Sequence, residues 1–352
     1  MSDLTIHEVK TKPSKANERD SSHWSWAQWS ALIGAVILFV EIWTLVAWLS
    51  DHPHQVNQFA TIGSVNWWAC TIYESLGLVL AIAVGSYVVR GCIRERRLTF
   101  DAAFLLSGSL MFWADANPNF FAPVLLYSSN FVNLNSPQGH MPFAINPVIG
   151  SMPDPILITV PLESCGLLAV AMAIGAVARW LRTRYPGIST QKLVGLLVLG
   201  GVVVEILVEL PMVGFGLWTY TTPAGISIPF GGGRRLSLIE VVAGTSFLLL
   251  PALLRLFKND RGETLVERGL QGKKPVARAV ILFLAVYSFT QILAWGPALV
   301  PDLLSSLYER PWPHLANYLV NDTCDAPGIT GTAYGPCPGS PSYRMPIRTS
   351  DP

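Results

Sequence analysis

Six glutamates interrupt segments of this chain that are otherwise strongly apolar. They are Glu41, Glu74, Glu163, Glu205, Glu209 and Glu240. An ionisable side chain at the centre of a bilayer costs about 2.5 to 3.5 kcal/mol on insertion scales, so each glutamate needs a partner or a function. Buried carboxyls act as general acids when protonated and as bases or stabilising anions when ionised. The set therefore predicts acid-base chemistry inside a membrane.

Two further features support this prediction. Asp115 and Asp154 lie at the ends of two apolar segments. Glu205 and Glu209 are four residues apart, so a helix places them on one face as neighbours. Such a pair suits an acid and a base that act together.

A structural role is the alternative for each glutamate, because a protonated or hydrogen-bonded carboxyl can link neighbouring helices. An Arg or Lys is the expected companion of a structural carboxylate, and none accompanies these six. No His falls within an apolar segment and no Glu-x-x-His motif occurs. The sequence therefore predicts a site with no metal.

Composition requires that helices in a membrane position these acids. The chain is 51% hydrophobic and 13% charged, against roughly one quarter charged in soluble domains. Its net charge of +1 speaks against a nucleic-acid partner. Windows of about 20 apolar residues, enough to cross the hydrocarbon core, predict an all-α polytopic bundle with seven spans near 29–49, 67–90, 99–115, 156–180, 192–212, 237–257 and 276–296.

The distribution of Lys and Arg predicts the orientation of the bundle. With a cytoplasmic N-terminus, 19 of the 24 Lys and Arg residues fall on the cytoplasmic side, and residues 114–155 contain none. Positive residues are enriched in cytoplasmic loops. We therefore expect a multi-pass protein of the cell membrane in contact with the lipid bilayer, with a disordered cytoplasmic tail at 1–25, a transmembrane domain at 26–300 and an extracytoplasmic tail at 301–352. In that oxidising tail a disulfide between Cys324 and Cys337 is expected, with two free thiols as the alternative.

This orientation places the acids at similar depths. A rise of 1.5 Å per residue puts Glu41, Glu74, Glu163 and Glu205 roughly 10 to 12 Å below the outer boundary, with Glu209 and Glu240 at about 5 Å. We therefore predict a catalytic group of Asp115, Glu163, Glu205 and Glu209. Glu41, Glu74 and Glu240 are expected to contact the substrate.

The predicted external segment, residues 114–155, alternates aromatic and amide side chains with acids. It has two interpretations. One is a turn-rich surface loop whose aromatic residues lie in the membrane interface. The other is a lid over the acidic cavity, in which Asn119, Tyr127 and Asn130 orient hydroxyl groups of an oxygenated, mostly apolar ligand. The length of the segment favours the lid.

Several of these pieces resemble the AveC-type spirocyclase family. The similar stretches are residues 94–102 leading into an apolar segment, an aromatic residue before Asp115, residues 127–133, residues 265–269 and the tail that contains the cysteines. In the family a Pro directly follows the Asp, whereas here Ala116 and Asn117 precede Pro118. The backbone of this loop is therefore expected to differ.

The resemblance implies closure of a dihydroxy ketone to a spiroketal, sometimes with dehydration and without a cofactor. The substrate would be a hydrophobic, oxygenated molecule of polyketide or lipid type. From the chemistry of ketal closure we assign Glu205 or Glu163 as the acid and Asp115 as the carboxylate that stabilises the oxocarbenium ion.

Three other functions are compatible with the sequence. A proton-coupled transporter or carrier of a hydrophobic metabolite would use the same acids; Pro211 and Pro251 could break its helices, although no internal repeats occur. An isoprenoid-type membrane cyclase would act on an alkene instead of a ketone. A scaffold without chemistry would tolerate Gln at each buried Glu.

Overall fold

The structure is a computed structural model, and it describes residues 24–115, 117–146, 149–222, 224–306 and 315–321. Cys324 and Cys337, with most of both predicted tails, lie outside the described residues. The described part is mostly helical. This agrees with the predicted all-α class.

Six helices are long and apolar enough to cross a membrane. Their outward faces carry large apolar side chains, such as Phe39 and Ile82, with 68% and 72% of their surface exposed, as expected where lipid replaces water. The six are α1 (Trp26–Ser50), α2 (Val65–Glu95), α4 (Ser164–Arg184) with the preceding π-helix η5 (Ile158–Glu163), α5 (Thr190–Phe215), α6 (Leu238–Leu256) and α7 (Pro275–Ser306).

The predicted span at 99–115 differs from the other six. It forms a ten-residue helix, α3 (Phe100–Ser109), followed by the 3-10 helix η1 (Leu110–Ala114). Ten residues of α-helix cover only about 15 Å, half the hydrocarbon thickness. Six helices, and not the predicted seven, therefore have spanning length in the described part of the chain. The Ser107-Gly108-Ser109 sequence at the end of α3 favours this stop because these residues have low helix propensity.

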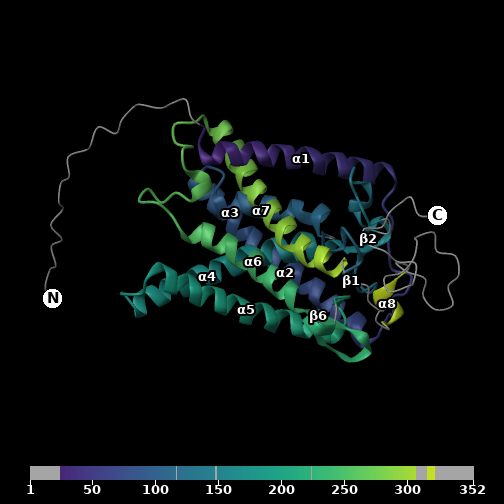
Figure 1. Ribbon diagram of the computed structural model, residues 1–352. Coiled ribbons are helices and arrows are strands. Elements are labelled where there is room, and N and C mark those ends of the chain that lie inside the picture. The colour runs from purple at the N-terminus through teal and green to yellow at the C-terminus, as the bar shows by residue number, and fades with distance from the viewer. Residues whose placement is uncertain (1–23, 116, 147–148, 223, 307–314, 322–352) are drawn as a thin grey trace, which may run out of the picture.

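Short antiparallel strand pairs gather at one end of the bundle (Figure 1). Asp101, near the start of α3, forms an ion pair of 2.8 Å with Arg255 near the end of α6, at the opposite end of the bundle. Helix α3 therefore runs toward the strands and stops beneath them. The strand pairs are β1 (Leu125–Tyr127) with β4 (Trp218–Tyr220), β2 (Asn133–Asn135) with β3 (Pro153–Pro155), and β5 (Ser227–Pro229) with β6 (Arg235–Ser237).

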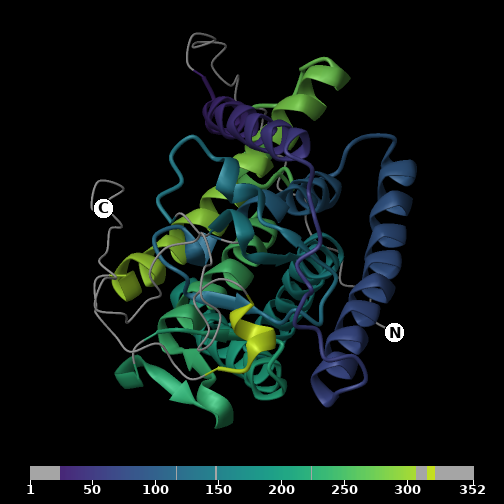
Figure 2. The same ribbon diagram turned by 90° about the vertical axis from the view of Figure 1, so that its right-hand side faces the viewer.

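The segment after η1 packs into the end of the bundle that faces the viewer in Figure 2. Its backbone is tied to the neighbouring helices: Val132 N donates to Glu74 at 2.7 Å, and the indole of Trp48 donates to the Asn135 carbonyl at 3.0 Å. Residues 122–131 are all buried. The segment is thus a packed wall of the bundle. Its remaining short helices, and those elsewhere, are η2 (Asn117–Asn119), η3 (Pro137–His140), η4 (Ile149–Ser151), η6 (Ala224–Ile226), η7 (Gly231–Gly233), η8 (Leu265–Glu267) and α8 (Asn317–Val320).

Candidate active site

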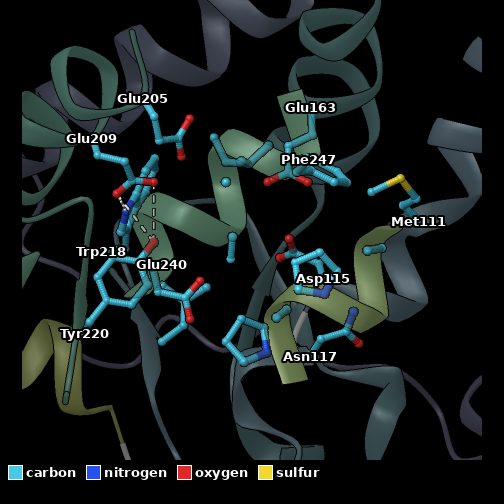
Figure 3. Close-up of a pocket in the computed structure, with 18 of the residues that line it drawn as sticks. Met111, Asp115, Asn117, Glu163, Glu205, Glu209, Trp218, Tyr220, Glu240 and Phe247 are labelled. Carbon is cyan, nitrogen blue, oxygen red and sulfur yellow. Dashed lines mark hydrogen bonds between the residues drawn. The ribbon is translucent and has the colours of Figure 1, made fainter. Parts of the chain in front are cut away.

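A cavity with a volume of about 200 Å³ lies where α2, η1, η5, α5, α6 and α7 meet the packed segment. Five carboxyls line it, and no Lys, Arg or His does among the residues that the structure describes. Glu205, Glu209 and Glu240 lie on one side, and Glu163 and Asp115 lie on the other (Figure 3). Five buried negative charges without a cation would be prohibitively costly. Some of these carboxyls must therefore carry protons.

Asp115 is the centre of a cluster of three acids at one wall. It follows η1, the point at which the short helix stops, and the Tyr127 hydroxyl donates to its Oδ1 at 3.3 Å. The carboxyls of Glu163 and Asp154 lie next to that of Asp115. Two carboxyls can hydrogen-bond each other only when one of them carries a proton. A hydrogen bond between any two of these three acids therefore requires a proton on one of them.

Glu163 reaches this cluster of acids because of the π-helix that precedes α4. Pro161 lies inside η5, and a proline has no backbone N–H to donate within a helix. The wider π turn is typical of functional sites. Here it ends at Glu163 and turns the carboxyl toward Asp115.

Asp154 lies behind Asp115, outside the cavity lining. Its side chain is fully buried on β3, where Asp154 pairs with Leu134. Burial and the neighbouring charge of Asp115 hold the pKa of Asp154 well above its usual range. A carboxyl in such surroundings favours its protonated form, which can donate to a neighbouring carboxylate.

Glu209 is the best-bonded acid of the opposite wall. The indole of Trp218 donates to it at 2.9 Å, and the Tyr220 hydroxyl lies 3.4 Å from both of its oxygens. Both donors come from β4, which begins two residues after Gly216, the residue that caps the C-terminus of α5 with a positive φ of 72°. That left-handed residue returns the chain toward its own helix, so the strand faces the last turns of α5.

Glu205 lies one helical turn before Glu209, as its spacing predicted, and packs against α6. A Cβ atom at Gly244 would lie only 1.9 Å from Oε1 of Glu205. The missing side chain at Gly244 therefore creates the space that the carboxyl occupies.

Glu240 lies in the first turn of α6. Ser237 caps that helix, with its hydroxyl accepting from Glu240 N at 3.3 Å. Oε1 of Glu240 is buried and has no hydrogen-bond partner within the described residues. A buried acceptor without a partner is available to a ligand.

Four predicted site residues lie away from the cavity and have other partners. Glu41 is buried between α1 and α7, where it accepts from the Tyr287 hydroxyl. Glu74 accepts from Val132 N. These contacts match the structural alternative, in which carboxyls link parts of the bundle.

The two predicted asparagines have similar structural contacts. Asn119 accepts from the backbone of Val124 at 2.7 Å and Leu125 at 2.8 Å. Asn130 accepts from Thr61 N at 2.6 Å. Both side chains shape the packed segment, and Tyr127 is the residue of the predicted hydroxyl-orienting group that reaches the cavity.

Several residues that sequence reasoning did not select also line the cavity. They include Tyr73, Met111, Asn117, Trp218, Tyr220 and Phe247. The alternation of Trp218 and Tyr220 two positions apart is a strand signal, and their place directly after an acidic helix end could have identified them. Within the described residues, no group of three or more His, Cys, Asp or Glu side chains is arranged to hold a metal ion.

Comparison with known proteins gives one family match. The family model described as "Spirocyclase AveC-like" matches residues 95–316, which is more than half of the chain. This region contains all five cavity carboxyls, whereas Glu41 and Glu74 precede it. Neither a search of curated proteins nor a search of solved structures found a match.

Proposed function

Because the chain belongs to the AveC-like spirocyclase family, we propose that it is a membrane-embedded cyclase that closes a dihydroxy ketone to a spiroketal by acid-base catalysis. The observation that carries this proposal is the cavity with five carboxyls and no basic residue among its described lining. Ketal closure needs a proton donor, a proton acceptor and an anion near a developing cation. Carboxyls in different protonation states supply all three.

The reaction proceeds in two ring closures. One hydroxyl oxygen of the substrate bonds to the carbonyl carbon, and its proton passes to the carbonyl oxygen, which gives a hemiketal. Glu205 then donates a proton to the hemiketal hydroxyl, which leaves as water. The second hydroxyl oxygen bonds to the resulting oxocarbenium carbon and loses its proton to a carboxylate. The net change is loss of one water.

The surroundings of each acid suggest its role. Glu209 accepts from Trp218 and Tyr220, and such donors suit an ionised base. Glu205, one turn away, is the proton donor. Asp115, which accepts from Tyr127 and lies beside Asp154, stabilises the oxocarbenium ion from the opposite wall. Glu163 shares a proton with Asp115 and is the alternative donor.

The substrate is a hydrophobic, oxygenated molecule of polyketide or lipid type. A cavity of about 200 Å³ is smaller than the 300 to 1,000 Å³ typical of pockets for drug-sized ligands. It therefore holds the ring-forming atoms, while the rest of a larger substrate extends out of it. No cofactor is needed for a reaction that involves only proton transfers and loss of water. The proposed setting is the cell membrane, with the cavity toward the extracytoplasmic side.

Proton-coupled transport is the second candidate, because α3 stops inside the bundle and a π-helix interrupts the start of α4. Discontinuous helices beside an ion site are typical of transporters. An isoprenoid-type cyclase is a third candidate. The three predict different changes in the substrate: loss of one water for ketal closure, an isomer of equal mass for alkene cyclisation and an unchanged molecule for transport.

The test compares metabolites and lipids of a deletion strain with those of strains that express the wild type, Glu205→Gln or Asp115→Asn at matched membrane abundance. Glu95→Gln is the control, since Glu95 lies at the opposite end of the bundle and pairs with Arg97 at 2.8 Å. We expect the deletion strain and both cavity variants to accumulate a precursor heavier than the product by one water. Accumulation of a precursor with the same mass as the product would support the isoprenoid-type cyclase instead. A molecule of unchanged mass that only moves to another compartment would support transport instead.

A further inference from the structure

A second pocket, between α4 and α6 at the end opposite the acidic cavity, is lined by basic side chains. Its volume is about 300 Å³. Arg179 and Arg182 reach it from α4, and Arg255 and Lys258 reach it from the end of α6 and the residues after it. The small residues Ala171, Gly175 and Ala252 form its floor. Figure 1 shows α4 and α6 side by side along their length.

Guanidinium groups from both helices converge over one glycine of this pocket. A Cβ atom at Gly175 would lie 3.5 Å from Nη1 of Arg179 and 3.9 Å from Nη1 of Arg255. Nε and Nη2 of Arg255 donate to the two carboxylate oxygens of Asp101 at 2.8 and 2.9 Å. Asp101 therefore fixes the orientation of Arg255 and leaves its Nη1 directed into the pocket.

Positive charge exceeds negative charge here. Four cations meet one acid, Asp101, and no acidic residue is among the described residues that line the pocket. Arg97 at the same end, by contrast, pairs with Glu95. The C-termini of α4 and α6 each contribute a partial charge of only about −0.5, so the surplus of arginine and lysine charge dominates. An anion is the expected ligand.

The surroundings indicate where that anion comes from. Trp180 and Val177, close to Arg179 on α4, are exposed on 61% and 48% of their surfaces. Exposed Trp at the end of a spanning helix is typical of the level of lipid headgroups. The predicted orientation places this end at the cytoplasmic leaflet, where anionic lipids attract basic residues.

We propose that the pocket between α4 and α6 binds the phosphate of an anionic phospholipid. Arg179 and Arg182 hold the phosphate together with Nη1 of Arg255, while the acyl chains lie along the apolar outer face of α4. Guanidinium groups bind phosphate oxygens through paired N–H donors. This site is separate from the acidic cavity, so the proposal does not depend on the proposed function.

Native mass spectrometry of the full chain in detergent tests the proposal with three probes: short-chain phosphatidylglycerol, short-chain phosphatidylcholine and glycerol phosphate. The double variant Arg179→Gln/Arg182→Gln removes two cations from the pocket. The double variant Arg261→Gln/Lys273→Gln removes two cations from the same end but outside the pocket. Arg179→Lys/Arg182→Lys keeps the charge and the fold.

We expect phosphatidylglycerol to bind the wild type and the Arg261→Gln/Lys273→Gln control equally. Binding to Arg179→Gln/Arg182→Gln should be about 30-fold weaker, because two basic residues are lost and each contributes about 1 kcal/mol to anionic-lipid binding. The lysine variant should bind more tightly than the glutamine variant but less tightly than the wild type, since lysine keeps the charge and lacks the paired donors. Equal losses of phosphatidylglycerol binding in both glutamine variants would show that diffuse surface charge attracts the lipid, and this result would overturn the proposal. Equal binding of phosphatidylcholine would overturn it as well. If glycerol phosphate binds as tightly as the lipid, the site is one for soluble phosphates and the lipid assignment is wrong.

Discussion

Gly244 on α6 leaves the space that the Glu205 carboxyl occupies, so adding one methyl group there should inactivate the protein without unfolding it. In Gly244→Ala the new Cβ would start 1.9 Å from Oε1 and 2.6 Å from Cδ of Glu205. Ordinary contacts of a Cβ begin at 3.4 Å, so the carboxyl must move by about 1.5 Å, the difference between these distances. A misplacement of about 1 Å can cost on the order of 100-fold in rate.

Stability should respond differently from activity. The group that must move is the far end of a flexible side chain, and Ala in a helix interior is favoured over Gly by about 0.5 to 1 kcal/mol. We therefore expect Gly244→Ala to lower the turnover of the accumulated precursor about 100-fold, measured in isolated membranes, with an unchanged or slightly raised melting temperature.

Gly200→Ala is the matched control, because this glycine is also helical and nothing lies within 4 Å of its added Cβ. It should keep full activity with the same small gain in stability. Full activity of Gly244→Ala, in a protein that Glu205→Gln inactivates, would refute the argument that the position of this carboxyl controls the reaction. A large loss of stability in Gly244→Ala would show that α6 cannot accommodate the methyl group by moving Glu205.

Three further predictions concern the other acids. Asp154 has a raised pKa, so its protonated form stabilises the fold at low pH, and this stability is lost as the pH rises through the raised value. In Asp154→Asn the melting temperature should therefore fall less steeply with rising pH than in the wild type. An unchanged slope would contradict the assignment of a raised pKa to Asp154. Trp218→Phe removes the 2.9 Å donor of Glu209 and should lower the free energy of unfolding by about 1 to 3 kcal/mol, with a shift of the pH–activity profile that a stability effect alone would not cause. Glu41→Gln, which can still accept from Tyr287, should leave turnover unchanged, whereas a clear rise in KM would restore the predicted role of Glu41 in substrate binding.

The expected depth of each acid in the membrane was the main basis for predicting which acids meet. It identified only some of the cavity acids correctly. Glu163 and Glu205 were expected at one level, and both line the cavity. Glu41 and Glu74 were expected at the same level but face α7 and the packed segment. The rise per residue fixes position along a helix axis, whereas the direction of a side chain around that axis depends on how the helix is rotated in the bundle.

The packed segment shows a similar limit. Its lack of Lys and Arg predicted its side of the membrane, and its amides were expected to contact a ligand. In the structure Asn119 and Asn130 instead satisfy buried backbone N–H groups, which a loop inside a bundle cannot leave without partners. The length of the helix at 99–115 was overestimated for a related reason. Hydropathy does not distinguish a helix that spans the lipid from a short helix that stops where protein surrounds it.

The sequence by itself determined the class of this protein, six of its long helices and the neighbouring pair Glu205 and Glu209. These features are local, because a bilayer sets the length and polarity of each span and a helix sets which residues share a face. Only the tertiary structure brought Asp115, Glu163 and Asp154 into one cluster and placed Trp218 and Tyr220 on Glu209. Those contacts join segments far apart in the chain, and they depend on a helix that stops early, a π turn at Pro161 and a glycine at position 244, whose effects appear only when the helices pack.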